Sequence, residues 1–432
     1  MERFSTWTPE QQDFCAGRGL CNYSFAMERI IDRYSEPNNL VELFNNLERL
    51  SISAWICVNG YEQNNLQNRS KMLINFYLCL SCYLMSLRYL ILAFITDETI
   101  RIILGDTFIG YSAHSLLNVI FFGATFLLSS IKTALAYSEF ISQMKILKVF
   151  SQLRKCSFKR SIYGLTRKND LKFRRVTCLA GHSLDGFILI ACGSCLALQA
   201  LAIVLNPIFS LRTLIFQVLW LPFVNACYYF AGLAAYWFFV HTIIFISLSI
   251  QSTSSVIIRV NRLIEGRLPL ERSVKDEIYH LNQLQNSHYN TIDILNISFG
   301  LSVFISFFFG SFFADLAFFC GTYIGTKNFF IDLLMSFIGF ITLGTITEYN
   351  FFASGSFKQI KNFRKTIFRM CFNISLDLRT RIKILATLDR MVAYRIGFYV
   401  GNIFCMDERT CLLFLLENLS LYLLLIANIS QS

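Results

Sequence analysis

The run CLLFLLENLSLYLLLIANIS, Cys411 to Ser430, is the stretch around which the fold is organised. A helix needs about 20 apolar residues to cross the hydrocarbon core of a bilayer, and this run has that length. It nevertheless contains Glu417, Asn418 and Asn428. Insertion scales put an acidic side chain at the centre of a membrane helix about 2.5–3.5 kcal/mol uphill, so such groups usually face water or a bundle interior. The run predicts a membrane-spanning helix that does not face lipid on every side.

Four residues of this run form one stripe of the predicted helix. Glu417, Leu421, Leu424 and Asn428 recur at i, i+4, i+7 and i+11, which is the spacing of a single helical face. Placed around an axis, such faces would form a carboxylate ring, an apolar constriction and an amide ring, so the stripe is a candidate pore lining. The alternative is that Asn418 and Asn428 hydrogen-bond to neighbouring helices as packing contacts.

The composition of the whole chain is that of a polytopic membrane protein. Of 432 residues, 54% are hydrophobic and 44 are Phe, which is outside the range of soluble domains. The first 30 residues lack the pattern of a cleaved signal peptide, which predicts a cytosolic N-terminus. We expect an all-α protein with seven transmembrane helices. The seven apolar runs cover about 72–96, 109–131, 186–206, 223–250, 296–320, 329–352 and 411–430.

The fourth apolar run is longer than one span requires, since apolar residues continue from Leu214 to Ile250. Pro222 is expected to end a helix near that point, because proline lacks the backbone N–H and clashes with the preceding turn. A connection within this segment is nevertheless too short to join two antiparallel helices. The sequence therefore predicts one long fourth span.

The distribution of positive charge predicts the orientation. Of the 39 Lys and Arg residues, 34 fall in four segments that seven spans would place on one side, and the opposite side receives Arg101, Arg212 and Lys327. Because basic residues accumulate on the cytosolic side, the N-terminus is expected inside and the C-terminus outside. We interpret the net charge of +11 as a topological signal and a possible contact with anionic membrane lipid, and we expect no nucleic-acid partner.

Three segments outside the apolar runs are predicted to form helices in the cytosol, or, for the first of them, in the cytosol or at the membrane interface. Leu40, Leu43, Phe44 and Leu47 share one helical face near the N-terminus, and residues 377–394 are amphipathic. Helical periodicity also continues beyond the fourth span and before the fifth, around a Gly-Arg-Leu-Pro break. We expect helices four and five to extend into the cytosol.

The C-terminal region resembles the insect gustatory receptors, whose last helix carries Thr-Tyr, five apolar residues and Gln-Phe. Leu421-Tyr422-Leu-Leu-Leu-Ile-Ala-Asn428-Ile429 keeps the tyrosine and the spacer, but Leu, Asn and Ile replace Thr, Gln and Phe. Upstream, Gly401, Phe404 and Asp407 resemble the punctuated segment that precedes that helix, and ILATLDRMVAY resembles the cytosolic helix before it. About 50 residues align in order, from Arg381 to Ser430.

The resemblance implies a gustatory-receptor-like chemosensory receptor in the plasma membrane. Such a receptor would be a ligand-gated, non-selective cation channel with four subunits, identical or mixed, around a pore lined by the last helix. We accordingly divide the chain into an N-terminal cytosolic segment (1–71), a six-helix sensing bundle (72–352), a cytosolic anchor region (353–410) and the pore-lining helix (411–432). A light-sensing role within the same family is an alternative.

Polar residues that are costly to embed collect in the outer half of the predicted bundle, which indicates a pocket for a small-molecule ligand. Arg88 and Asp315 have opposite charges at similar depth, so we expect them to pair, either as a structural ion pair or facing a ligand. His241 lies deeper, with no partner that the sequence identifies. The pocket candidates are Arg88, His114, Gln199, Asn225, Tyr228, Tyr229, Asp315 and Asp332.

Other functional classes are less consistent with the sequence. Cys79/Cys82 and Cys192/Cys195 have metal-site spacing, but they lie inside spans without nearby His, so we expect buried thiols, no metal and no cofactor. Phosphate loops and catalytic triads are missing, which predicts that the protein is not an enzyme. A seven-helix G-protein-coupled receptor requires the opposite orientation, and a secondary transporter would normally show repeated halves.

Overall fold

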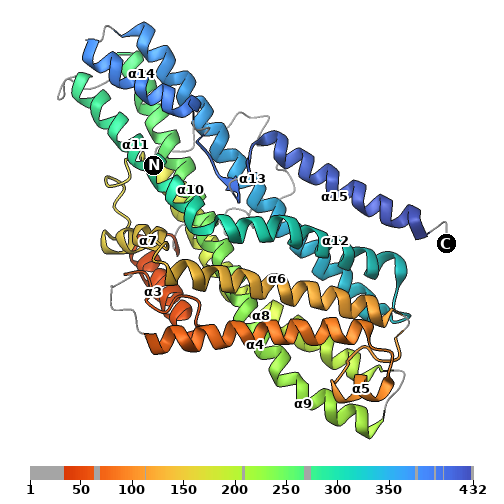
Figure 1. The fold of residues 1–432 in the computed structure, drawn as a ribbon. Coiled ribbons are helices and arrows are strands. Elements are labelled where there is room, and N and C mark those ends of the chain that lie inside the picture. The colour runs from red at the N-terminus through yellow and green to blue at the C-terminus, as the bar shows by residue number, and fades with distance from the viewer. Residues whose placement is uncertain are drawn as a thin grey trace, which may run out of the picture.

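The chain folds almost entirely into α-helices (Figure 1). The computed structural model describes residues 34–62, 69–111, 113–206, 210–266, 274–374, 378–393, 396–401 and 403–429. Within them, the strands form one short two-stranded hairpin, and every other element is helical. The predicted all-α class is confirmed.

Each of the seven predicted spans falls on a helix. In the described part of the chain, 6 segments are long and apolar enough to cross a membrane. The third predicted span, 186–206, lies on α8 (Arg167–Val204), which has 38 residues. The 6 segments are Ser70–Phe94 on α4 (Arg69–Phe94), His114–Phe140 (α6), Leu211–Ile264, Asp276–Ile324, Phe329–Asn373 (α13), and Glu408–Ala427 on α15 (Glu408–Ile429).

The fourth span is one continuous helix, as predicted. It consists of α9 (Leu211–Cys227), the π-helical segment η1 (Tyr228–Gly232) and α10 (Leu233–Ile264). The expectation that Pro222 ends a helix is wrong, because α9 continues through it. Proline is tolerated inside membrane helices, where adjacent helices and local π-type adjustments make up for the lost backbone hydrogen bond.

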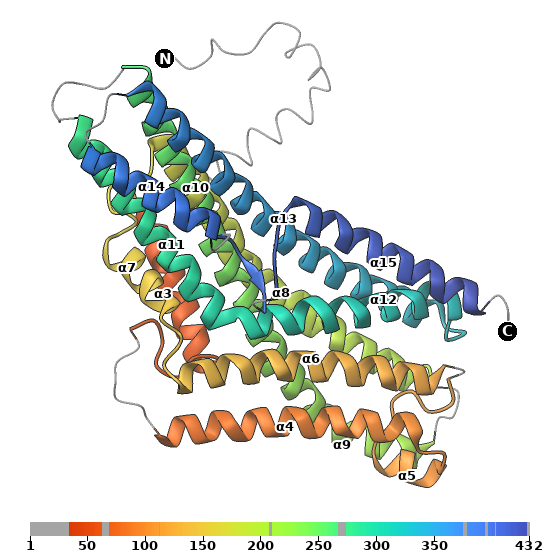
Figure 2. The same cartoon turned by 45° about the horizontal axis from the view of Figure 1, so that its top comes forward.

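Long helices project beyond the bundle at the end opposite α5 (Glu98–Ile103) (Figure 2). The fifth span combines α11 (Val274–Ile305), η2 (Ser306–Gly310), α12 (Ser311–Phe319) and η3 (Cys320–Ile324). The predicted extensions of helices four and five are present, since α10 and α11 continue past the apolar runs. The amphipathic segment at 377–394 forms α14 (Leu378–Ala393), and the domain boundary predicted at 353 falls inside the 45-residue α13.

The amphipathic N-terminal helix is confirmed as α3 (Pro37–Ser53). It packs against α8 and α7 (Ile146–Lys155). Its apolar stripe is turned into the core rather than toward solvent. The buried side chains include all four predicted residues, Leu40, Leu43, Phe44 and Leu47.

The helices of the bundle differ widely in how much of their surface they bury. In the most apolar window of the fourth span, 78% of the residues are buried, and α10 contributes Trp237, Phe238 and Phe245 to the main core. A second core cluster lies near α5 and gathers side chains from α4, α6, α8, α9, α12 and α13. In contrast, only 6% of the window in α15 is buried. The last helix therefore lies on the outside of the bundle.

A tight hairpin precedes the last helix. Strand β1 (Tyr399–Val400) pairs antiparallel with β2 (Phe404–Cys405), so that Val400 lies opposite Phe404. Gly401 follows β1 with φ +55°, and a Cβ there would stand 2.8 Å from the Cβ of Phe304. The left-handed conformation and the close approach both favour glycine. These constraints give the Gly401 of the family-like segment a structural role.

Asp407 caps the last helix. Its Oδ1 accepts hydrogen bonds from the Thr410 backbone N–H at 2.8 Å and from the Thr410 hydroxyl at 3.0 Å. Burial tends to raise the pKa of the Asp407 carboxyl, but hydrogen bonds from Thr410 and Arg409 outweigh it and hold that pKa below its ordinary value. An N-cap carboxylate satisfies helix N–H groups that have no partner within the helix. Asp407 therefore fixes where α15 begins.

We predict that Gly401→Ala lowers the melting temperature of the purified chain, while Gly344→Ala preserves or raises it. At 401 the methyl group meets Phe304 in a backbone conformation that costs an L-residue about 1–2 kcal/mol. Gly344 lies in α13 with no atom within 4 Å of its would-be Cβ, so alanine gains up to about 1 kcal/mol of helix propensity. Thermal unfolding followed by tryptophan fluorescence measures both; shifts in the same direction would contradict the role of Gly401.

Candidate functional site

A loop containing α5 covers one end of the bundle. Asp97 caps α5 by accepting a hydrogen bond from the Thr99 backbone N–H at 2.8 Å. In the last turn of α5, the Arg101 guanidinium forms a buried ion pair with Asp106 at 2.7 Å. The same carboxylate accepts a hydrogen bond from the backbone N–H of Phe108 at 3.0 Å. The loop is therefore held in a single conformation by its own charged residues.

Asp106 also joins this loop to two membrane helices. Asn118 of α6 donates from Nδ2 to Oδ1 of Asp106 at 3.3 Å. Gln217 of α9 donates from Nε2 to the backbone carbonyl of Asp106 at 2.8 Å. All three side chains are buried. The sequence analysis missed this cluster, because Asp106 and Gln217 are 111 positions apart. The only local signal was Arg101 and Asp106 in one short loop.

Arg88 holds the same loop from α4. Its Nε donates to the Leu104 carbonyl at 2.7 Å and its Nη2 to the Gly105 carbonyl at 2.6 Å. The guanidinium also lies over the rings of Tyr89 and Trp220, at 5.0 and 4.9 Å from their centroids. Carbonyls at a helix C-terminus have no intrahelical partner and attract cations. Arg88 thus binds the end of α5 through Nε and Nη2, while its buried Nη1 has no hydrogen-bond partner among the described residues.

The predicted ion pair between Arg88 and Asp315 does not form, and that expectation is wrong. Asp315 lies on α12 with only 3% of its surface exposed, and its Oδ2 has no hydrogen-bond partner. Gln199 on α8 is equally buried, and neither atom of its side-chain amide has a partner. Buried polar groups are normally hydrogen-bonded, so unpartnered ones indicate a place for water or a ligand.

Tyr228 and the sequence neighbours of Gln199 and Asp315 meet at the second core cluster. The ring of Tyr228 packs against this cluster, 6.4 Å from the centroid of Phe121. Leu198 and Leu316, the sequence neighbours of Gln199 and Asp315, belong to or pack against the same cluster. Tyr228 therefore packs against this apolar region, and Gln199 and Asp315 each lie one position along their helix from a residue of it.

Two other predicted pocket residues do not join this region. Asn225 donates from Nδ2 to the Leu221 carbonyl of its own helix at 2.9 Å. Tyr229 is 37% exposed, and its ring packs edge-on against that of Phe230 at 5.3 Å. Adjacent residues of a helix point in different directions, which separates Tyr229 from Tyr228.

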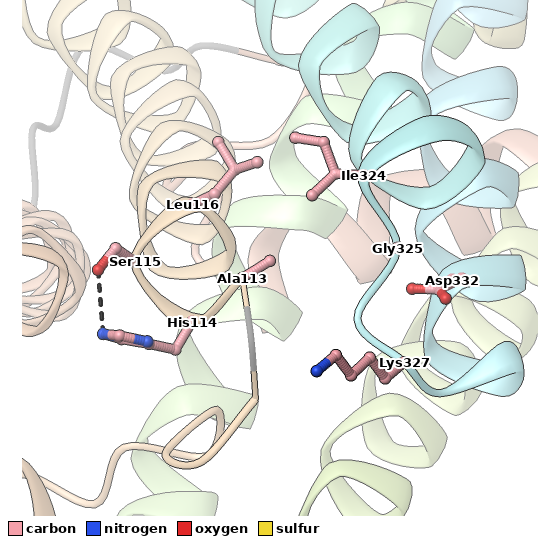
Figure 3. Close-up of a pocket in the computed structure, with 8 residues that line it drawn as sticks. All are labelled: Ala113, His114, Ser115, Leu116, Ile324, Gly325, Lys327 and Asp332. Atoms are coloured by element: carbon pink, nitrogen blue, oxygen red, sulfur yellow. Dashed lines mark hydrogen bonds between the residues drawn. The ribbon is translucent and has the colours of Figure 1, made fainter. Parts of the chain in front are cut away.

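His114 and Asp332, the remaining candidates, line one pocket at the end of the bundle (Figure 3). It has a volume of about 700 Å³ and lies between the start of α6 and the turn that precedes α13. The imidazole of His114 is 3.0 Å from the Ser115 hydroxyl. Lys327 lines the same pocket from the opposite side; the sequence analysis counted it only as a loop charge.

A hydrogen-bonded turn holds Lys327 in this position. Asp332 Oδ1 accepts the backbone N–H of Thr326 at 2.6 Å, and Asn328 Oδ1 accepts that of Phe330 at 3.1 Å, capping α13. Lys327 has φ +64°, a left-handed conformation that is uncommon for residues other than glycine, asparagine and aspartate. The surrounding turn therefore determines where this side chain points.

The last helix has one packed face and one open face. Phe414 is buried, and the Tyr422 hydroxyl lies 2.9 Å from that of Thr322 on η3. Asn418 donates to the Phe414 carbonyl at 2.6 Å, so it does not bond a neighbouring helix as the packing alternative expected.

The predicted pore stripe lies largely on the open face. Glu417 is exposed, Leu421 is half-buried and Leu424 is 59% exposed. Position 428 is helical, but the side chain of Asn428 lies outside the described residues.

The cysteines at metal-like spacing are partly described. Cys79 and Cys82 are buried in α4 as free thiols, in agreement with the expectation of small buried side chains. The side chains of Cys192 and Cys195 lie outside the described residues.

Comparison with known proteins gives a match at the level of structure. No protein-family model and no curated protein matches the sequence. The fold is similar to that of the insect olfactory receptor OR5 from Machilis hrabei, solved in complex with eugenol, with a TM-score of 0.59 and 11% sequence identity. The match covers 90% of this chain and 99% of that chain. The helical membrane fold implied by the gustatory-receptor resemblance is therefore shared with a solved insect olfactory receptor.

We predict that Arg88→Gln destabilises the purified chain by about 2–3 kcal/mol, because charged hydrogen bonds to the end of α5 are lost. Asp315→Asn should change stability by less than about 1 kcal/mol, since it keeps the shape of a side chain with an unpartnered oxygen. Thermal unfolding of both variants and the double variant measures this. Without an ion pair, the stability changes of the two single variants should sum to that of the double variant within about 0.5 kcal/mol. A strongly non-additive double variant would show that Arg88 and Asp315 interact after all.

Proposed function

We propose that this chain is a subunit of a chemosensory receptor that acts as a stimulus-gated cation channel. The fold is similar to that of an olfactory receptor that holds a small molecule, eugenol. The chain carries several membrane-spanning helices, and we place the assembled receptor in the plasma membrane. The C-terminal resemblance favours a gustatory stimulus within this class, with four subunits around one pore.

Support for a pore comes from the open face of α15. Glu417 is exposed on this face, and no hydrogen bond or ion pair joins it to another described residue. A single chain in a bilayer would present this carboxylate to lipid, which is costly for an acidic side chain. Further copies that enclose a water-filled path along this face would remove the cost. We therefore infer that α15 helices from several subunits meet around the permeation path.

The residues of this face have distinct roles in the proposed pore. Glu417 lies nearer the start of α15 and would form a ring of carboxylates, which attracts cations. Leu421 and Leu424 would form an apolar constriction that excludes water when the helices are close together. Asn428 would contribute an amide ring near the outer mouth.

Contacts between α12 and α15 supply a route from stimulus to pore. Asp315 lies on α12, next in sequence to Leu316, which packs against the second core cluster, and we propose that this region receives the stimulus. Further along the same helix, the ring of Phe318 packs 5.3 Å from that of Tyr422 on α15. The Tyr422 hydroxyl contacts Thr322 at 2.9 Å on the segment that follows. A ligand that displaces α12 would therefore also move the last helix.

We predict that Asp315→Asn shifts the stimulus concentration that gives a half-maximal current, while surface expression stays at the wild-type level. Loss of a carboxylate from the stimulus region changes ligand affinity, whereas assembly depends on other surfaces. Dose–response recordings combined with surface labelling measure the two quantities separately. Normal sensitivity would remove Asp315 from the stimulus site, and loss of surface protein alone would indicate a purely structural role.

We predict that Glu417→Gln lowers single-channel cation conductance severalfold, or lowers permeation of divalent relative to monovalent cations, without changing stimulus sensitivity. A neutral ring concentrates fewer cations at the pore. Glu408→Gln is a matched control, because Glu408 lies in the first turn of α15, outside the proposed pore stripe, and pairs with Lys358 at 2.9 Å. Identical currents from the wild type and Glu417→Gln would argue against a pore on this face.

We predict that Leu424→Ser causes current without stimulus, because a hydroxyl wets the closed apolar constriction. Cysteines at 421, 424 and 428 should be blocked by thiol reagents, whereas cysteines at 419 and 423 should be spared. In a single chain Leu419 and Leu423 are 56% and 55% exposed, so only assembly distinguishes them from Leu424. The same reactivity at all five positions would contradict the pore assignment.

A further inference from the structure

The pocket of about 700 Å³ brings together two opposite charges that do not pair with each other. Lys327 and Asp332 both line it, yet no ion pair joins either side chain to another described residue. Figure 3 shows Lys327 extending into the space that faces His114, while Asp332 lies behind Gly325 on the far side of the turn. The pocket therefore presents a cation and an anion at separate positions on its wall.

The backbone of the turn keeps these two charges apart. Gly325 and Lys327 both have positive φ, +67° and +64°, within three residues of each other. Asp332 is committed through Oδ1 to the Thr326 N–H at 2.6 Å, which leaves Oδ2 for another donor. The ammonium group of Lys327 has no such commitment. Lys327 and Asp332 are close in sequence, but the fixed backbone of the turn keeps their side chains from forming an ion pair.

The rest of the pocket wall is apolar on one side and polar on the other. Ala113, Leu116 and Ile324 contribute the apolar part, and His114 with Ser115 contributes the polar part. His114 and Ser115 are also the first residues of α6, whose N-cap, Ala113, provides no side-chain hydrogen bond. The N–H groups of a first helical turn lack intrahelical partners and favour negative charge. The His114 N–H already donates to the Tyr111 carbonyl at 3.2 Å, so the Ser115 N–H and the Lys327 ammonium group are what favour a negative group here.

We propose that this pocket binds a small zwitterion of the amino-acid type. Its carboxylate would accept hydrogen bonds from Lys327 and the start of α6, and its ammonium group would donate to Oδ2 of Asp332. An apolar substituent would lie against Leu116 and Ile324. A simple anion would be attracted by Lys327 but repelled by Asp332. A simple cation would be attracted by Asp332 but repelled by Lys327, so only a ligand with both charges is favoured at both positions.

This inference deepens the proposed function, because it assigns a ligand class to one predicted part of the sensing region. The inference rests on the proposed function only in expecting that the bound zwitterion changes the channel current. Binding itself is measurable on the purified full chain in lipid nanodiscs without any recording. A channel that opens without binding zwitterions and a chain that binds them without conducting are therefore separate results.

The test uses three zwitterions that differ in charge separation and apolar bulk: L-leucine, β-alanine and γ-aminobutyrate. Calorimetric titration of each into the nanodisc sample should give saturable binding for at least one. For L-leucine the controls are L-leucinol, which lacks the carboxylate, and 4-methylpentanoate, which lacks the ammonium group; for the other two they are the corresponding amine and acid. Each control should bind at least 10-fold more weakly, because it loses one of the two charge contacts.

Two substitutions assign the binding to this pocket. Lys327→Gln and Asp332→Asn should each weaken the zwitterion at least 10-fold, and the asparagine keeps an oxygen for the Thr326 N–H. Arg212→Gln, which removes an exposed charge at the start of α9, should change affinity less than 2-fold.

Three results would overturn the proposal. The first is that none of the three zwitterions binds. The second is that Lys327→Gln binds the zwitterion with unchanged affinity. The third is that the acid control binds as tightly as the zwitterion, which would identify a plain anion site. Because Lys327 is exposed, its substitution still tests the site even if Asp332→Asn fails to fold.

Discussion

Within the hydrocarbon core a polar group has no water to bond, so it needs a partner from the protein itself, and this constraint shapes the bundle at both ends. At the end opposite α5, the Lys132 ammonium donates to the Trp55 carbonyl at 2.8 Å. Glu139, on the same helix, accepts the backbone N–H groups of Val58 and Asn59 at 2.9 and 2.8 Å. The costly charges of α6 thereby hold the segment after α3 inside the bundle. Arg88 and Asp106 hold the α5 loop at the other end in the same way.

The last helix departs from this rule on one of its faces. Phe414 packs against Phe307 of η2, the Tyr422 hydroxyl contacts Thr322 of η3, and Asp407 caps the first turn, so the polar groups on the packed face have partners. Glu417 has no comparable partner among the described residues. Because Arg88, Asp106, Lys132 and Glu139 all have hydrogen-bond partners within the chain, we interpret the unpaired carboxylate of Glu417 as part of a surface completed by other copies of the chain. The pore proposal follows from this contrast.

Sequence reasoning succeeded where structure depends on local pattern and failed where it depends on contacts across the bundle. Hydropathy and periodicity predicted the spans and the buried face of α3, and Gly401 was found through its motif. The sequence pointed to Asp315 as the partner of Arg88, because Asp315 is the opposite charge at the most similar depth. The actual partners are the backbone carbonyls of Leu104 and Gly105, which a sequence does not reveal, since every residue has a carbonyl. Likewise His241 contacts the Tyr61 hydroxyl at 2.6 Å across 180 positions, in a segment outside the membrane spans.

The number of chains in the purified receptor and the environment of α15 test the central claim most directly. Electron microscopy of the full-length protein in lipid nanodiscs would determine both. The account predicts four copies around an axis, with Glu417 and Leu424 of each α15 turned toward a water-filled path. A particle with one chain, in which the open face of α15 contacts lipid along its length, would contradict it.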